Sequence, residues 1–100
     1  MRVINLNTSS ETGYIYIGRA VPEYGLEASA LGNPYTLEDF SRAEAIEKYR
    51  DWLWEKIESG DKGVLAALNE LSEESVLACW CKPEACHGDV VMAAWERLQE

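Results

Sequence analysis

All three cysteines and the only histidine of this 100-residue chain lie in one short stretch near its carboxyl end. They are Cys79, Cys81, Cys86 and His87. An odd number of clustered cysteines is not the disulfide framework of a small secreted domain. The cluster is typical of a reducing compartment, where thiols serve catalysis, metal binding or packing, and it predicts that a functional site lies here.

A cysteine nucleophile is the first hypothesis for this stretch. Cys86 and His87 are expected in the first turn of a helix, where unpaired N–H groups and the positive end of the helix dipole favour an anion. Such a position lowers the pKa of a thiol and stabilises the reactive thiolate. We therefore expect Cys86 or Cys81 to be the catalytic nucleophile, assisted by His87.

Helical geometry restricts what His87 can contact. Consecutive helical residues diverge by about 100°, so His87 is poorly placed to act as a base for Cys86. We expect it to face Cys79 or Cys81 across the junction between strand and helix. Asp89 belongs to the same catalytic group, and it either orients His87, acts as a base or complements the helix dipole.

Two other interpretations of these residues stay open. Cys79, Cys81, Cys86 and His87 make the Cys3His set that structural zinc accepts, although the spacing C-x-C-x4-C-H differs from the usual pair of knuckles. Alternatively, the stretch is a packing motif in which the thiols are buried and His87 bonds to a carbonyl. For Cys79 alone, a small buried hydrophobe is the preferred interpretation. The catalytic hypothesis needs no cofactor, whereas the zinc alternative makes the metal one.

Two glycine-containing dipeptides, Gly18-Arg19 and Gly32-Asn33, are candidates for ligand binding. Arg19 follows a predicted strand, and its guanidinium fork suits a carboxylate or phosphate, although a salt bridge to one of the eighteen acids explains it equally well. Gly32-Asn33 precedes a proline, and it either lets the backbone approach a ligand or forms a tight turn. Together these residues predict a site for a small anionic ligand.

The elements that must position these residues follow from the hydrophobic periodicity. Short β-prone runs indicate strands, whereas apolar steps of three and four residues indicate helices. Ser41 and Glu44 have the spacing of a capping box, and Asp61 can cap a second helix. The predicted strands span 3–6, 14–17 and 75–81, and the predicted helices span about 42–58, 61–71 and 86–98. The last helix is expected to present His87, Val91, Ala94, Trp95 and Leu98 along one face.

This order predicts one small α/β domain over residues 1–100, a layered sheet with helices and a cysteine-rich strand-to-helix junction. The strand at 75–81 is apolar on both faces and is therefore expected at the centre of the sheet. Open α/β sheets bind ligands outside the carboxyl ends of their strands. Gly18-Arg19 and Cys81 both follow strands and are expected at that rim.

Charge and hydropathy exclude two classes of partner. Nine basic and eighteen acidic residues give a net charge of −9, the wrong sign for non-specific nucleic-acid binding. No apolar run approaches the ~20 residues of a membrane span, and the amino end lacks the apolar region of a signal peptide. The chain is therefore expected to be cytoplasmic, with a small anionic ligand, and its acidic surface leaves a protein partner open.

Several of these segments occur in the order and spacing of a known family. They are Tyr16-Ile17-Gly18-Arg19, Gly32-Asn33-Pro34-Tyr35, Ser41-Arg42, and the segment Leu77-Ala78-Cys79-Trp80-Cys81-Lys82-Pro83-Glu84-Ala85-Cys86-His87-Gly88-Asp89. The chain resembles the family called domain of unknown function 4326, found in bacteria and their phages, across nearly its whole length. That family has no settled activity, so the resemblance implies no mechanism.

The carboxyl end is also similar, more weakly, to the family called domain of unknown function 488. In that family a strand and a cysteine precede a Cys-His-Arg segment and a helix. The similarity carries over only Cys79 or Cys81, Cys86 and His87, and Gly88 stands where that family has arginine. If that arginine holds an anion, the resemblance implies that Arg19, Lys82 or the backbone takes the role here.

From the residues, we expect a domain that binds or processes a small phosphorylated or nucleotide-like ligand with a Cys/His site at its strand ends. The alternative is a non-catalytic module that binds zinc or a protein partner.

Overall fold

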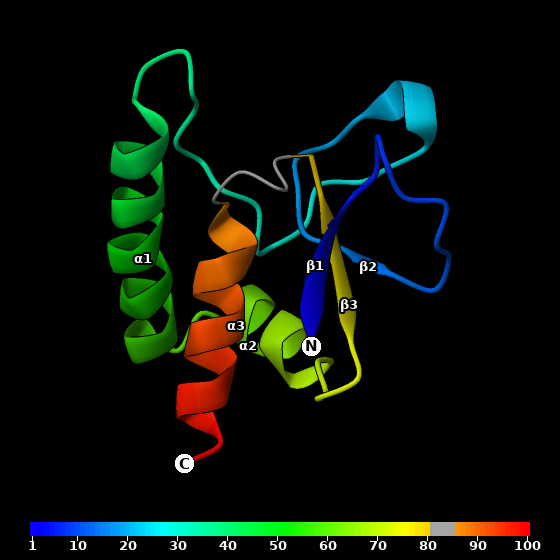
Figure 1. Cartoon of the computed structure of the whole chain (residues 1–100). Helices are drawn as coiled ribbons and strands as arrows, with labels where there is room; N and C mark the ends of the chain where they lie inside the picture. The colour runs from blue at the N-terminus through cyan, green and yellow to red at the C-terminus, as the bar shows by residue number, and fades with distance from the viewer. Residues whose placement is uncertain (81–85) are drawn as a thin grey trace.

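A computed structural model of the chain describes residues 1–80 and 86–100. The described residues form a small parallel sheet, a short 3-10 helix (η1) and α-helices on one side of the sheet (Figure 1). The elements are β1 (Arg2–Asn5), β2 (Ile15–Tyr16), η1 (Pro22–Tyr24), α1 (Arg42–Ser59), α2 (Lys62–Asn69), β3 (Val76–Cys79) and α3 (His87–Leu98). The α/β fold predicted from the sequence is therefore confirmed.

The sheet has the order β1-β3-β2, and both outer strands run parallel to β3. Leu77 of β3 lies opposite Val3 on one side and Ile15 on the other. Ala78 is buried like Leu77, as expected for a central strand covered on both faces. The central position predicted for this strand is confirmed.

β2 and β3 are shorter than the sequence predicted, whereas β1 has the predicted length and is shifted by one residue. β3 ends at Cys79, and Trp80 already lies in a bend, while Cys81 lies outside the described residues. β2 comprises Ile15–Tyr16 alone, although one further ladder bond joins the N–H of Ile17 to the carbonyl of Ala78 at 3.1 Å. Apolar β-prone residues continue past both strand ends, and this composition is why the prediction ran too long.

The first two α-helices begin where the sequence predicted. The Ser41 hydroxyl accepts a hydrogen bond from the N–H of Glu44, whose carboxylate accepts from the N–H of Ser41, so the predicted capping box is present. Gly60 ends α1 in the left-handed conformation with φ of 76°, which glycine adopts without strain. Asp61 then caps α2 by accepting from the N–H of Val64 at 3.0 Å.

The core lies between the sheet and the helices. Tyr49 and Leu53 of α1, Leu68 of α2 and Val91 of α3 are buried in one hydrophobic cluster with β3. Leu98 does not belong to it, contrary to the prediction, and is 44% exposed. As the last residue of α3, it lies beyond Ala94, which belongs to the core cluster, and Trp95, which packs against it.

The start of α3 packs closely against β1, and Gly88 is the reason. A Cβ atom at Gly88 would lie 2.8 Å from Cγ2 of Val3, closer than real contacts allow. The missing side chain therefore lets the first turn of α3 approach the sheet. In the described part of the chain, no helix is both long enough and apolar enough to cross a membrane.

Candidate functional site

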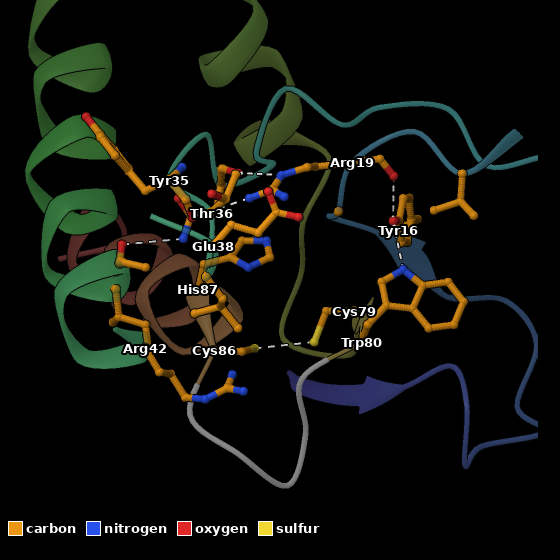
Figure 2. Close-up of a pocket in the computed structure, with 16 residues that line it drawn as sticks. Tyr16, Arg19, Tyr35, Thr36, Glu38, Arg42, Cys79, Trp80, Cys86 and His87 are labelled. Carbon is orange, nitrogen blue, oxygen red and sulfur yellow. Dashed lines mark hydrogen bonds between the residues drawn. The ribbon is translucent and has the colours of Figure 1, made fainter. Parts of the chain in front are cut away.

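The carboxyl ends of β2 and β3 open into a cleft of about 630 Å³ (Figure 2). Its other walls are the first turns of α1 and α3 and the segment 33–38 that precedes α1. We define the cleft by these lining residues: Tyr16, Gly18, Arg19, Val21, Asn33, Tyr35, Thr36, Leu37, Glu38, Arg42, Ala45, Ile46, Cys79, Trp80, Cys86 and His87. It occupies the edge of the sheet where open α/β folds bind ligands.

Two thiols face each other at the base of the cleft. Cys79 ends β3 and Cys86 directly precedes α3, and their sulfur atoms are 3.3 Å apart. Figure 2 shows the two side chains pointing toward one another. Each residue is only 2% exposed, yet both line the cleft. Cys79 is thus buried as expected, but it lies at the strand end beside a second thiol.

Cys86 is the N-cap of α3, a position usually taken by serine, threonine, aspartate or asparagine. Its sulfur accepts a hydrogen bond from the N–H of Gly88 at 3.2 Å. Asp89 in turn accepts from the N–H of Cys86 at 3.3 Å, which completes a capping box. The spacing C-x-x-D is that of a capping box, so it was a usable sequence signal. Asp89 thereby acts on the helix terminus, one of the three roles predicted for it.

His87 is buried, and it joins α3 to the end of β2. Its Nε2 atom lies 2.7 Å from the carbonyl oxygen of Ile17, and because a carbonyl only accepts, Nε2 donates. The ring meets that of Tyr49 edge to face, with 5.1 Å between the centroids. With Nε2 protonated, Nδ1 is the nitrogen that can accept a proton.

Tyr49 supports this arrangement from α1. Its side chain is fully buried, and its hydroxyl donates a hydrogen bond of 2.6 Å to the carbonyl of Leu31. Burial raises the pKa of Tyr49 above its ordinary value of 10.0, and negative charge on Cys86 raises it further. The hydroxyl therefore stays protonated and keeps the Leu31 segment tied to α1.

Arg19 reaches from the end of β2 to the segment before α1. Its Nε donates to the carbonyl of Asn33 at 3.1 Å, and one terminal nitrogen donates to the carbonyl of Tyr35 at 3.3 Å. Within residues 1–80 and 86–100, no carboxylate lies within ion-pair distance of its guanidinium. The salt bridge considered for Arg19 is thus not seen there, and the positive charge lines the cleft without one.

The glycines of both predicted dipeptides shape the wall. The carbonyl of Gly18 accepts from the N–H of Ser29, and a Cβ on Gly32 would lie 3.1 Å from that same carbonyl. Gly32 therefore allows the loop to approach the strand end, and it does not itself line the cleft. Asn33 does line it, and its side chain accepts from the N–H of Tyr35 and donates to the carbonyl of Ala45. Its side-chain contacts thus hold the wall in place.

Arg42 is a lining residue that the sequence interpretation missed. It follows the N-cap Ser41 and so lies in the first turn of α1, where the helix dipole disfavours a cation. A basic residue in that position was a usable signal for a role outside the helix. Figure 2 shows its side chain extending from α1 beside the cleft, below Cys86 in this view. The acid Glu38 also lines the cleft and was likewise missed.

Trp80 and Tyr16 form an aromatic wall of the cleft. The indole N–H of Trp80 donates to the hydroxyl of Tyr16 at 3.0 Å, and this hydroxyl donates to the carbonyl of Arg19 at 2.6 Å. The Trp80 ring also packs against the ring of Tyr24, with 5.7 Å between the two ring centroids. Trp80 is only half-buried, so it offers an aromatic surface beside the arginine.

The zinc alternative involves one residue that the structure does not describe. Cys79, Cys86 and His87 converge near the strand ends, whereas Cys81 lies outside the described residues. Within the described ranges, no group of three His, Cys, Asp or Glu side chains could hold a metal ion. Since Nε2 of His87 donates to the Ile17 carbonyl, Nδ1 would have to be the ligand atom.

Within the described residues, these features define a class: a small α/β domain with a three-stranded parallel sheet and, at its strand ends, a cleft lined by two arginines and two thiols. The chain belongs to the family described as domain of unknown function (DUF4326), whose model matches residues 4–97. The family resemblance inferred from the motifs is thereby confirmed. No curated protein and no solved structure matches the chain.

Proposed function

We propose that the cleft binds a small phosphorylated or nucleotide-like ligand, and that Cys86 is the nucleophile that acts on it. One observation carries the proposal. In a chain with twice as many acids as bases, the described residues that line the cleft include two arginines, Arg19 and Arg42, and one acid, Glu38. This local reversal of charge lies at the strand ends, above a pair of thiols.

The dimensions and walls of the cleft support a ligand of this class. Small-molecule pockets hold about 300–1,000 Å³, and the cleft has about 630 Å³. The guanidinium groups of Arg19 and Arg42 suit the oxygens of a phosphate, which they can bind with two parallel hydrogen bonds. Trp80 offers a face on which a base or another planar ring can stack.

The surroundings of Cys86 support a nucleophilic role. A backbone N–H donates to its sulfur, and such a hydrogen bond favours the charged form of a thiol. The helix dipole acts in the same direction. His87 would hold the start of α3 at the end of β2 through its bond to the Ile17 carbonyl, and the thiolate would form a covalent bond to an electrophilic atom of the bound ligand. We place this activity in the cytoplasm, where reducing conditions preserve the thiols.

Calorimetric titration with inorganic phosphate and with adenosine monophosphate under reducing conditions tests the binding. Glu38→Gln removes the acid of the cleft, so we expect it to tighten the binding of either probe by roughly twofold to fivefold. Glu47 is exposed like Glu38 but lies in α1 outside the cleft. Glu47→Gln is therefore the matched control, and we expect it to leave the affinity unchanged. If neither probe binds, or if the two variants behave alike, the proposal is wrong.

The metal content of the purified protein tests the nucleophile separately. The proposal predicts no stoichiometric zinc and one thiol that is alkylated rapidly near neutral pH and is lost in Cys86→Ser. Stoichiometric zinc, with thiols that react only after chelation, would favour the zinc-binding alternative on Cys79, Cys81, Cys86 and His87.

A further inference from the structure

The pair of thiols at the base of the cleft has a geometry that nucleophilic catalysis alone does not require. A single thiolate suffices for attack, yet the Cys79 sulfur lies 3.3 Å from that of Cys86. Cys79 is held by the ladder of β3, and Cys86 is held by the capping box of α3. Two independent elements therefore bring the sulfurs into contact.

We propose that Cys79 and Cys86 are a redox-active pair, in which a hydroperoxide oxidises Cys86 and Cys79 resolves the product as a disulfide. The disulfide would regulate the cleft, because it removes the nucleophile. That consequence rests on the proposed function, whereas formation of the disulfide does not. A disulfide needs about 2.05 Å between its sulfur atoms, and these two sulfurs already lie 3.3 Å apart.

The contacts of the two sulfurs set the order of the reaction. Cys86 accepts the N–H of Gly88 at the start of α3, and a thiol stabilised as thiolate in this way is the one that oxidants attack first. Cys79 ends β3, and the N–H of Gly88 donates to the sulfur of Cys86 and not to that of Cys79. Cys86 is thus the site of oxidation and Cys79 the resolving thiol.

The chemistry balances with hydrogen peroxide as the oxidant. The Cys86 thiolate attacks one peroxide oxygen, so that an S–O bond forms, the O–O bond breaks and the departing hydroxide takes up a proton as water. The Cys79 sulfur then attacks the sulfenic sulfur of Cys86. The S–S bond forms, the S–O bond breaks, and a second water leaves with the Cys79 proton. Two thiols lose two electrons in all, and the peroxide gains them.

Access to the pair is through the cleft. Both residues are 2% exposed, but both line the cleft, so a molecule as small as peroxide can reach them from there. A ligand seated between Arg19 and Trp80 would block the same route. We therefore expect adenosine monophosphate to slow the oxidation of the pair.

Mass spectrometry of the full chain after peroxide treatment tests the pair. Cys81→Ser leaves only Cys79 and Cys86, and we expect this variant to lose two hydrogen atoms and to recover them with a reductant. In Cys79→Ser/Cys81→Ser, the oxidised Cys86 should persist as a sulfenic acid that dimedone traps. In Cys81→Ser/Cys86→Ser, the remaining Cys79 should give far less dimedone adduct.

Peptide mapping of peroxide-treated wild-type protein tests for the same Cys79–Cys86 disulfide in a chain that carries no substitution. A Cys79–Cys86 cross-link supports the inference, whereas a disulfide that uses Cys81, or two intact thiols in Cys81→Ser, overturns it. Binding of adenosine monophosphate by the reduced protein is measured on the same samples. Binding without a disulfide contradicts this inference alone, and a disulfide without binding contradicts the proposed function alone.

Discussion

At the scale of single residues, Tyr49 links the cleft to the core. It packs against His87, stacks on Trp52 and bonds to the carbonyl of Leu31. Its place among the apolar steps of the helix predicted over about 42–58 indicates burial, because helical periodicity reports which side of a helix is covered. It could not predict the hydrogen bond, because the acceptor comes from a loop eighteen residues away whose path has no periodic signal.

The raised pKa of Tyr49 predicts a specific pH dependence. Its pKa in the folded state lies above the ordinary value of 10.0, so its contribution to stability is complete below pH 10.0 and falls as pH rises above that value. Tyr49→Phe should lower the free energy of unfolding by about 1–3 kcal/mol at about pH 7, because the Leu31 carbonyl loses its hydrogen-bond donor. Measured by urea unfolding, the free energy of unfolding should then fall less steeply for the variant than for wild type between about pH 10 and about pH 11. Equal declines would contradict the assignment.

At the scale of elements, the N-terminus of α3 is the part that the sequence predicted least completely. The helix and its approximate start were predicted, but Cys86 proved to be the cap and not a member of the first turn. A thiol is a rare cap, so Cys86 itself was not predicted to be the N-cap. The interval of three residues to Asp89 carried the missing information, in the same way that Ser41 and Glu44 identified the start of α1.

The close approach of α3 to β1 gives an element-scale prediction. Gly88→Ala should lower the free energy of unfolding by about 1–3 kcal/mol, because its methyl group would overlap the Val3 side chain. Shortening the Val3 side chain should relieve this overlap. In denaturant unfolding, Val3→Ala/Gly88→Ala should therefore lose less free energy of unfolding than the sum of the losses of the two single variants. Strict additivity would show that Val3 is not what restricts position 88. Gly63→Ala, where a Cβ meets ordinary contacts, is the control.

At the scale of the whole molecule, the fold brings Arg19 and Arg42 together at the cleft where β2 and β3 end, in a protein whose net charge is −9. The sequence predicted the location, because parallel strands present their carboxyl ends at one edge. It did not identify Arg42, because its entry into the cleft depends on how α1 packs against α3. Packing between distant elements sets that placement, and local spacing does not report it.

The central claim is that an anionic ligand binds between Arg19, Arg42 and Trp80. Heteronuclear NMR of reduced protein tests it directly by following arginine Nε–H and tryptophan indole N–H signals during titration with adenosine monophosphate. We predict saturable shifts for those three side chains. The signals of Trp54 and Arg97, which pack together outside the cleft, should stay fixed. Equal shifts in both groups, or no shift in the first, would contradict the account.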